Sequence, residues 1–333
     1  MTSYVKEFWG WKKNNSTPKE IVILNKKKSN LNHPKLEITI GIPTFKRLKL
    51  LERSLYSLSI QSFKKFKVII SNNNYKDEKK LIEICKKFKD KFEYLSIYSH
   101  KINNGSLSNL YFLLNKSNSK YFMWLADDDE VSSNYLKELK KILDKDSKIV
   151  SAMAQHKIFS SKKKSIIKNA SQLSSNYTII RIFKFLVGMD DAAFYGLHRA
   201  KYIKKCTFEG YYWPINNIIT NVCYILLFQL TLFGKTEYSD KAEWICHNYT
   251  HKYHSTPKYK IKKKILEQIQ FPFRRLNVNF LYIKKINDYF KNPLYTLLFV
   301  PVAISSFLKD IISSAIYFTA RLFKFVFDKM FPA

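Results

Sequence analysis

The stretch that decides the fold is Tyr121-Phe-Met-Trp-Leu-Ala-Asp127-Asp128-Asp129-Glu130-Val131, in which apolar residues run directly into consecutive carboxylates. Its apolar part is short, bulky and bounded by polar segments, which predicts a buried β-strand. A core strand cannot bury three adjacent acids without partners, so we expect the acids where the chain leaves the sheet. Carboxylates at i and i+2, here Asp127 and Asp129, can face one divalent ion and a phosphate-bearing ligand, and their oxygen atoms suit Mg²⁺ or Mn²⁺.

A simpler interpretation is that the acids form a solvated turn in front of a helix. In that case the side chain of Asp129 or Ser132 would cap the helix. An Asp-rich turn on its own favours this simpler interpretation, so the choice depends on the segments that precede the turn.

The segments around the acidic turn alternate between predicted strands and predicted helices. Strands are predicted at 36–42, 66–70, 94–98 and 149–154, and the helices between them carry apolar residues at spacings of three and four. This order indicates βαβ units and a mainly parallel sheet of the α/β class. In such a sheet ligands bind outside the carboxyl ends of the strands.

Polar groups gather at these predicted strand ends. They occur at Thr44–Arg47, Ser71–Asp77 and Asp127–Asp129, and the loop Asn103–Asn109 adds more. Because the carboxyl ends of parallel strands meet at one edge of a sheet, a ligand site becomes a better interpretation than an isolated acidic turn.

The composition excludes several classes of protein. Of the 333 residues 46% are hydrophobic, enough for a sizeable core, but the 7 glycines argue against a Gly-rich phosphate loop. The excess of 58 basic over 26 acidic residues gives a net charge of +32, which attracts phosphates, nucleic acid or anionic membranes. The four cysteines form no CxxC pair and predict a reducing compartment. The N-terminus lacks the apolar core of a signal peptide, so we expect the main body of the protein in the cytoplasm.

The second half of the chain gives weaker signals. Residues 155 to about 180 are polar and basic and are expected to form a loop. Residues 193–199 are strand-like, and 218–233 form a strongly apolar predicted helix that Gly234 ends. The segment 244–254 is rich in His and Tyr and is interpreted as a solvated polar loop.

Four regions follow from these patterns. Residues 1–35 are a basic extension, 36–255 the α/β domain, 256–292 a basic helical linker and 293–333 amphipathic helices. The uncharged run at the start of the last region has 15 residues, about 22 Å as a helix, which is short of the ~30 Å hydrocarbon core. Beyond Lys309 and Asp310 polar residues recur at helical spacing opposite an aromatic face, which is typical of an interfacial anchor on an anionic membrane. A single membrane span, and packing against the α/β domain or a second copy of the chain, are the alternatives.

Four motifs carry a resemblance to a known family. Together they resemble the nucleotide-sugar half of family 2 glycosyltransferases, closely over 36–130 and loosely to about 255. The resemblance implies a GT-A fold, which is Rossmann-like with a mainly parallel central sheet flanked by helices, and an inverting sugar transfer from a nucleotide diphosphate to an acceptor hydroxyl. The motifs are Ile40-Gly-Ile-Pro43-Thr44-Phe45-Lys46-Arg47, Gln61-Ser62-Phe63 with the strand Phe66-Lys-Val-Ile-Ile70, Asn103-x-Gly105 with Asn109, and Asp127-x-Asp129.

The resemblance also implies roles for individual residues. Asp129 would be the main ligand of Mn²⁺ or Mg²⁺, with Asp127 beside the metal and the ribose. Asn72 stands where the family usually has an Asp that reads the base, and Lys46 replaces the usual Asn; the base therefore stays open, with a UDP-sugar as the expected donor. The residues expected to bind the nucleotide sugar are Pro43, Thr44, Phe45, Arg47, Asn72, Asn109, Asp127 and Asp128.

The catalytic base is not where the resemblance places it. The family has an acid at the start of a helix well after the metal motif, but there this chain reads Asn216-Asn217, and an amide cannot act as a general base. We expect Asp191, and next Asp190, to take this role; the alternative is that the pair caps a turn. His198, His251 and His254 are candidates for contacts with the diphosphate or the acceptor.

The sequence therefore predicts a metal-dependent glycosyltransferase with a lipid-linked or membrane-held glycan acceptor. Its place would be the cytoplasmic face of the inner membrane, as a peripheral or monotopic protein. The alternative is a non-catalytic membrane- or nucleic-acid-binding protein on a degenerate GT-A scaffold, which the net charge of +32 and the missing acid favour.

Overall fold

The computed structural model describes residues 18–22, 36–73, 76, 78–103, 105–160, 163–168, 172–188, 191–209, 211–213, 218–220, 222–248 and 276–330. The chain forms two compact units, each considered separately here. The first comprises Met1–Arg181 and Asp190–Tyr249, and the second comprises Ile182–Met189 and Thr250–Ala333.

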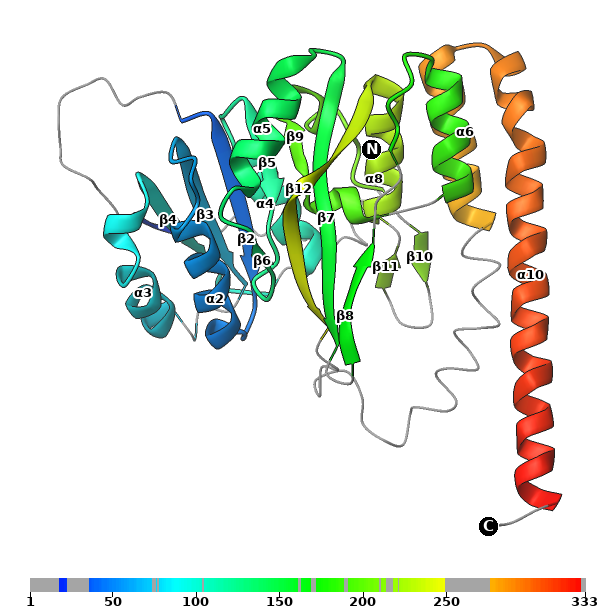
Figure 1. The fold of residues 1–333 in the computed structure, drawn as a ribbon, viewed down its shortest axis with the longest axis horizontal. Coiled ribbons are helices and arrows are strands. Elements are labelled where there is room, and N and C mark those ends of the chain that lie inside the picture. The colour runs from blue at the N-terminus through cyan, green and yellow to red at the C-terminus, as the bar shows by residue number, and fades with distance from the viewer. Residues whose placement is uncertain are drawn as a thin grey trace. The chain divides into compact units, whose positions relative to one another are not determined.

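The first unit is built on one mixed sheet with the strand order β1-β4-β3-β2-β5-β9-β7-β12-β6, in which β8 pairs with β7 (Figure 1). Its strands are β1 Lys19–Val22, β2 Ile38–Thr44, β3 Phe66–Asn72, β4 Tyr94–Ser99, β5 Tyr121–Trp124, β6 Glu130–Val131, β7 Ile149–Ser160, β8 Lys163–Lys168, β9 Leu197–Arg199 and β12 Lys235–Asn248. Strands β10 Tyr211–Trp213 and β11 Ile218–Thr220 form a separate antiparallel pair.

Most of the sheet runs in one direction. Strands β4, β3, β2 and β5 are parallel neighbours, and β12 is parallel to β7. Strand β9 is antiparallel to both β5 and β7, so β7 and β12 run the same way as the first four strands. The prediction of a mainly parallel α/β sheet is confirmed.

Helices follow the strands as the periodicity predicts. In the first unit they are α2 Leu48–Ser59, α3 Glu78–Lys86, α4 Ser106–Lys116, α5 Tyr135–Lys145, α7 Ala200–Ile203 and α8 Val222–Phe233, with short 3-10 helices η2 Lys89–Lys91 and η3 Ala192–Tyr195; helix α6, Thr178–Gly188, runs from the first unit into the second. The turn before α4 contains Gly105 at φ 85°, a backbone conformation that glycine adopts without strain.

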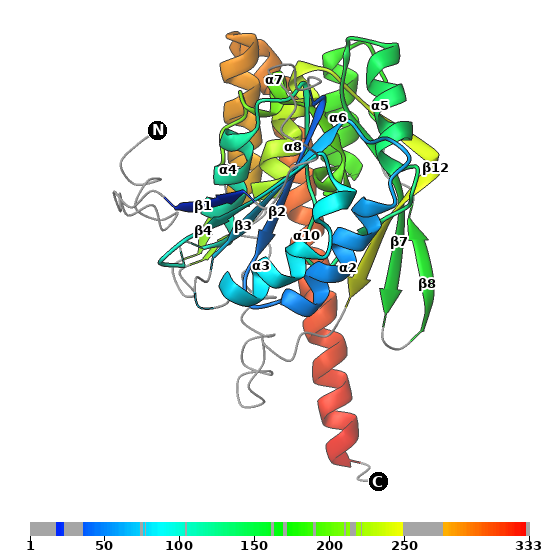
Figure 2. The ribbon, with the colours of Figure 1, turned by 90° about the vertical axis from the view of Figure 1, so that its left-hand side faces the viewer.

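The sheet is packed on both faces. Ile38, Ile40 and Ile42 of β2 enter one hydrophobic core with residues of α2, α3 and α5. On the opposite face Gly41 lets α4 approach, because a Cβ there would lie 3.0 Å from the Cβ of Leu113. Figure 2 shows α2 and α3 on one side of these strands and α4 on the other. With both faces covered, the strand ends are where a ligand can reach the sheet.

Two predicted loops are wrong in part. Residues 155–160 continue β7 and 163–168 form β8, so these two strands make an antiparallel pair. Residues 244–248 belong to β12, which pairs with both β7 and β6. The lysines here lie on strands held by backbone pairing rather than by an apolar face, so hydrophobic periodicity gave no signal.

Two further segments differ from the expectation. Within the basic extension, β1 pairs antiparallel with β4 and covers that edge of the sheet. The apolar run at 218–233 is divided, with 218–220 in β11 and the helix starting at Val222. The helix ends before Gly234 as expected, where a Cβ would lie 2.4 Å from the Lys148 carbonyl oxygen.

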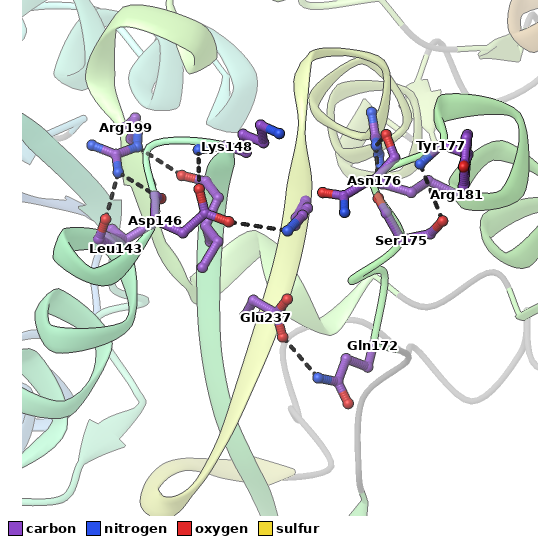
Figure 3. A network of polar contacts seen from close by, with 12 residues as sticks. Leu143, Asp146, Lys148, Gln172, Ser175, Asn176, Tyr177, Arg181, Arg199 and Glu237 are labelled. Carbon is purple, nitrogen blue, oxygen red and sulfur yellow. Dashed lines mark hydrogen bonds and ion pairs between the residues drawn. The ribbon is translucent and has the colours of Figure 1, made fainter.

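Buried guanidinium groups fasten the second half of the sheet (Figure 3). Arg199 at the end of β9 donates to the carbonyls of Leu143, Asp146 and Ile149, and so joins β9 to α5 and β7. The Asp146 carboxylate pairs with Lys235 of β12 at 3.0 Å. Arg181 of α6 donates to backbone carbonyls before α6 and at the end of α8. Each guanidinium satisfies several carbonyls that would otherwise be buried without a donor.

The described part of the second unit is helical. Residues 276–290 form one helix, and α10 spans Pro293–Met330. Val278, Tyr282 and Ile286 are buried, and Asn279 Nδ2 donates to the Ala303 carbonyl at 3.0 Å, which joins the two helices.

Helix α10 leaves much of its apolar surface exposed. The exposed residues include Leu294, Leu297, Leu298, Ile304, Leu308, Ile311, Ile312 and Ile316. By length and composition Pro293–Ser313 is the one described segment that could cross a membrane, with 21 residues, a mean hydropathy of 1.6 and 6% of it buried. This length corresponds to about 31 Å of helix, close to the hydrocarbon core.

Candidate active site at the acidic turn

The acids follow a fully buried strand, as the sequence predicts. The four side chains of β5 are 0% exposed, and the chain then turns at Asp127 and Asp128 before entering β6. Asp127, Asp128 and Asp129 are themselves buried. The acidic turn, defined as Ala126–Glu130, therefore holds carboxylates that are largely removed from water, which is costly unless cations or hydrogen-bond donors face them.

One of these cations is Arg47, which the sequence placed in the nucleotide site. Its guanidinium lies 2.5 Å from a carboxylate oxygen of Asp127 and 2.7 Å from one of Asp128. The Arg47 side chain is 34% exposed, whereas that of Asp127 is 0% exposed. A single guanidinium thus bridges two carboxylates and remains open to solvent on its other side.

The backbone of the acidic turn is held by helix α2. Ser54 Oγ lies 2.6 Å from the Asp129 carbonyl and 3.2 Å from the Ala126 carbonyl. Arg53 donates to the Asp128 carbonyl at 2.5 Å and pairs with Glu130 at 2.9 Å. We did not predict these two residues. The available signal was Ser54 itself, a hydroxyl at a buried position of the leucine stripe on α2.

The environment of the turn shifts the pKa values of its carboxyl groups. Burial raises the pKa of Asp127 to about 6, against the opposing effect of the Arg47 guanidinium. Burial and the neighbouring Asp128 carboxylate raise the pKa of Asp129 to about 7. Burial therefore disfavours the charged form of Asp127 and Asp129, and a bound cation would favour it.

Strand β12 forms the other wall of the acidic turn. Cys246 and the backbone of His247 interact with the Asp129 carboxylate and oppose the rise in its pKa. The His247 ring lies 2.6 Å from Glu130, and it stacks on Phe159 of β7 with ring centroids 5.4 Å apart. Asp129 and Glu130 thus contact a strand that lies more than a hundred positions later in the chain.

The ends of β3 and β4, together with Asn109 of α4, form a wall of buried polar side chains. Asn72 and Asn109 are buried, as are Ser71 and His100. Asn109 Nδ2 donates to the Ser71 carbonyl at 2.9 Å, and the Ser71 hydroxyl lies 2.9 Å from His100 Nε2. The groups are hydroxyls, amides and an imidazole whose pKa burial lowers. This wall is thus built of neutral groups that both donate and accept hydrogen bonds.

The end of β2 carries the remaining residues predicted to bind a nucleotide. Thr44 is buried beside Asp127, and the Phe45 ring is 38% exposed. Lys46 has φ 59°, in the left-handed region that Asn tolerates better than Lys, and its ammonium lies 5.0 Å from the centre of the Phe45 ring. The usual Asn of the family motif is therefore consistent with the backbone found here.

Asp191 is connected to the acidic turn through Cys223 and Tyr195. It precedes η3, whose Phe194 ring stacks on Trp124 of β5 with centroids 4.6 Å apart. Asp191 acts on the pKa of Cys223, and Tyr195 interacts electrostatically with Cys223 and with Asp129. Asp191 is exposed, so water or an acceptor can reach its carboxylate.

Of the histidines predicted to contact a ligand, the structure describes His198. His198 is 0% exposed, with its ring 3.0 Å from Ser151 Oγ and 3.2 Å from the Phe194 carbonyl, and burial lowers its pKa to about 4. These contacts correct the expectation that His198 contacts a diphosphate or an acceptor, because both ring nitrogens already have partners inside the protein. Asp190, His251 and His254 lie outside the described residues.

Neither Asp129 nor Ser132 caps the helix after the turn. Helix α5 begins after Asn134 with no side-chain cap bond. Its Leu136 amide instead donates to Gln61 Oε1 at 3.1 Å, while Gln61 Nε2 donates to the carbonyls of Ser132 at 2.7 Å and Ser57 at 3.0 Å. Gln61, a buried residue that follows α2, therefore satisfies a backbone amide at the start of α5, a role that the simpler interpretation assigned to the acids.

The donor set of the turn fits a divalent cation that is completed by a substrate. Among the residues that the structure describes, no three His, Cys, Asp or Glu side chains converge into a metal cluster. Mg²⁺ and similar ions are commonly held by one or two carboxylates plus phosphate oxygens and water. The side chains of Asp127 and Asp129, buried carboxylates two positions apart, have the chemistry of such ligands.

Comparison with known families agrees with this site. The family described as "Glycosyl transferase family 2" matches residues 39–206, just over half of the chain. The matched region begins in β2 and ends after β9, so it contains the acidic turn and the strand ends around it.

Curated relatives match a similar region. One from Campylobacter jejuni, named GalNAc(5)-diNAcBac-PP-undecaprenol beta-1,3-glucosyltransferase, is 32% identical over 108 residues, which are 32% of this chain and 33% of the relative. An uncharacterized glycosyltransferase of Rickettsia prowazekii is 28% identical over 152 residues, 45% of this chain and 46% of the relative. The chain spans less than half the length of these relatives.

Solved structures share the fold. TarS 1–349 of S. aureus has a TM-score of 0.58 at 12% identity over 83% of this chain and 72% of that chain. The mannosyltransferase PcManGT of Pyrobaculum calidifontis, in complex with GDP-Man and Mn²⁺, has a TM-score of 0.50 at 9% identity over 89% of this chain and 81% of that chain. These likenesses confirm the predicted GT-A fold.

Proposed function

The chain belongs to glycosyl transferase family 2, and from this premise we propose that it is a metal-dependent, inverting glycosyltransferase. It would move a sugar from a nucleotide-diphosphate donor, with a UDP-sugar as the expected one, to a glycan acceptor held on a lipid. The proposed place of action is the cytoplasmic face of the inner membrane.

The observation that carries this proposal is the buried acidic turn at the carboxyl end of β5. Asp127 and Asp129 are buried, their pKa values are raised, and a single guanidinium faces Asp127. Around them lie the strand ends at Thr44 and Asn72, where the family binds its nucleotide. Buried carboxylates beside strand ends that carry neutral polar groups are suited to a metal-bound nucleotide diphosphate.

The residues of this chain would divide the reaction between them. A divalent ion held by Asp129 and Asp127 would neutralise the charge that develops on the leaving diphosphate. The β2 end at Pro43, Thr44 and Phe45 would hold the nucleoside, and Asn72 would face the base. The acceptor oxygen would form a bond to the anomeric carbon as the bond to the diphosphate breaks, which releases a nucleoside diphosphate.

We propose Asp191 as the base that takes the proton of the acceptor hydroxyl, with Asp190 as the next candidate. Asp191 is exposed and lies on the segment that packs against the end of β5. Its carboxylate interacts with Cys223, which in turn interacts with Tyr195 beside Asp129.

The acceptor and the membrane location rest on separate observations. The Campylobacter relative is named for an undecaprenol-linked substrate, which supports a lipid-linked glycan for this chain. The exposed apolar surface of α10 supports contact with a membrane. The lysine-rich sequence before it favours an anionic leaflet.

A thermal-shift screen tests the proposed function. The full chain is heated with UDP, GDP and other nucleoside diphosphates, with and without Mn²⁺, because a ligand of the native state raises its stability. We expect a rise in Tm that requires both Mn²⁺ and one nucleotide. Asp129→Asn should lose this rise, whereas Asp90→Asn, an equivalent change on the exposed helix η2, should keep it.

Two outcomes contradict the proposal. If Asp129→Asn responds to Mn²⁺ and nucleotide like the unchanged protein, the acidic turn is not the metal site. If no nucleotide stabilises the protein while RNA binds tightly and in a salt-sensitive manner, the chain is a nucleic-acid binder on a glycosyltransferase scaffold.

A further inference from the structure

We propose that the Arg47 guanidinium takes the place of the divalent cation in the donor-free enzyme and moves to the donor's diphosphate when metal and donor bind together. This inference rests on the proposed function of the acidic turn. It adds a role for Arg47 in the order of binding: the metal alone binds weakly, and the metal with the donor binds tightly.

The contacts of Arg47 are those expected of an internal counter-ion. Its guanidinium lies 2.5 Å from Asp127 and 2.7 Å from Asp128, so it bridges two of the three carboxylates of the turn. Asp127 is fully buried and would otherwise be a carboxylate without a facing cation. Leaving a buried carboxylate without its ion-pair partner is strongly unfavourable, so the guanidinium stabilises the turn while no metal is bound.

A metal ion and Arg47 would compete for the same carboxylate of Asp127. The Arg47 ion pair ends on its Oδ1 atom, and the Asp127 side chain is fully buried. A cation that binds to Asp127 must therefore displace the guanidinium or accept a like charge a few ångströms away. Either event lowers the affinity of the turn for a metal ion on its own.

Arg47 is placed to move, whereas its neighbour Arg53 is not. Arg47 precedes the first residue of α2, makes no side-chain cap bond and is 34% exposed. Arg53 is bound to both the Asp128 carbonyl and Glu130 from within the same helix. The acidic turn therefore keeps Arg53 and Ser54 as supports when Arg47 leaves.

The diphosphate of the donor gives Arg47 a second partner. A planar guanidinium binds phosphate oxygens in a bidentate manner as well as it binds carboxylates. Donor and metal together would then exchange one set of ion pairs for another: carboxylates to metal, and guanidinium to diphosphate. By linkage, each of the two ligands strengthens the binding of the other by the same factor.

The experiment compares four full-length proteins: unchanged, Arg47→Met, Arg47→Lys and Lys49→Met. Lys49 is exposed on the same turn of α2, so its replacement removes one positive charge from the same region without touching the acids. Electron paramagnetic resonance of free Mn²⁺ gives the Kd for Mn²⁺ with and without UDP, or with whichever nucleoside diphosphate the thermal-shift screen selects. This readout does not require sugar transfer.

We expect Arg47→Met to bind Mn²⁺ alone about tenfold more tightly than the unchanged protein, and to lose about tenfold of the strengthening that UDP provides. Lys49→Met should resemble the unchanged protein. Arg47→Lys should change in the same direction as Arg47→Met but less, because an ammonium cannot bridge both carboxylates in a fixed geometry. If Arg47→Met does not fold, the Arg47→Lys variant still provides the test.

Three results overturn the inference. The first is an unchanged affinity of Arg47→Met for Mn²⁺ alone, and the second is an unchanged coupling between Mn²⁺ and UDP. The third is an equal effect in Lys49→Met, which would reduce the role of Arg47 to general charge. If the unchanged protein binds no nucleoside diphosphate with Mn²⁺, the proposed function itself fails, which is a different result from the first three.

Discussion

At the scale of single residues, the three carboxylates of the acidic turn have distinct surroundings. Asp127 faces Arg47 and Thr44, Asp128 lies between the other two acids, and Asp129 faces strand β12. The spacing Asp127-x-Asp129 predicted the metal ligands, and this assignment stays a prediction. The spacing could not reveal the opposing charge of Arg47, because that contact depends on the pairing of β2 with β5.

His198 provides a prediction about pH. Burial lowers its pKa from 6.5 to about 4 in the folded state, so above pH 6.5 the ring is neutral in both states and has no effect. Between pH 6.5 and pH 4, His198 binds a proton in the unfolded chain but stays mostly neutral in the folded chain. The free energy of unfolding therefore falls as the pH falls. The loss should reach about 3 kcal/mol near pH 4.

Urea unfolding at a series of pH values gives the free energy of unfolding of the unchanged protein and of His198→Gln. The difference between the two free energies measures the loss that His198 causes. Asp127 and Asp129, whose pKa values are raised, act in the opposite direction but equally in both proteins. The difference in unfolding free energy should therefore shrink as the pH is lowered. A difference that stays constant from neutral pH to about pH 4 would show that His198 does not titrate as its burial requires.

At the scale of elements, the predictable part is the part with regular periodicity. Strands β2 to β5 and helices α2 to α5 follow from apolar spacing, because their apolar residues recur with a regular period. The second half of β7 and the strands β8 and β12 were missed because their pairing joins distant segments and their lysines carry no periodic signal. The β12 wall of the site, with Cys246 and His247, was missed for the same reason.

Gln61 carries a prediction at this scale. Gln61→Ala removes one acceptor and one amide donor from a fully buried position, and leaves the Leu136 amide and the Ser132 carbonyl without these partners. The free energy of unfolding should fall by about 2 kcal/mol. Chemical denaturation measures it, and Ser62→Ala, at an exposed neighbouring position, should change stability by no more than about 0.5 kcal/mol. Equal stability of the two variants would refute the role of Gln61 as the support of α5.

At the scale of the whole molecule, the features that support catalysis and those that support membrane contact belong to different units. The acidic turn and the residues around it belong to the first unit, and α10 belongs to the second. Composition indicated a membrane-associating end, but periodicity left open whether it lies on the bilayer or crosses it. The segment Pro293–Ser313 has the length and composition for a span, and both arrangements place the same apolar residues in lipid.

The exposed face of α10 predicts how membrane binding responds to charge. Ile312 is 60% exposed, and Ile312→Glu should weaken co-sedimentation with phosphatidylglycerol vesicles by about tenfold, because an apolar side chain no longer enters the lipid. Ser313→Glu adds the same charge at an exposed polar position of the same helix, and should have a much smaller effect. Equal losses would point to simple repulsion from the anionic surface rather than insertion of this face.

The register that joins Val131 to Trp244 has a consequence for synthesis. A ribosome delivers α2 and the acidic turn early, but the strand that walls off Asp129 leaves the exit tunnel more than a hundred residues later. Domains generally form as units while they emerge, so until β12 arrives the nascent chain presents its acids to the cytosol without their second wall. We therefore expect the ability to hold a metal and a nucleotide to arise in a single late step of translation.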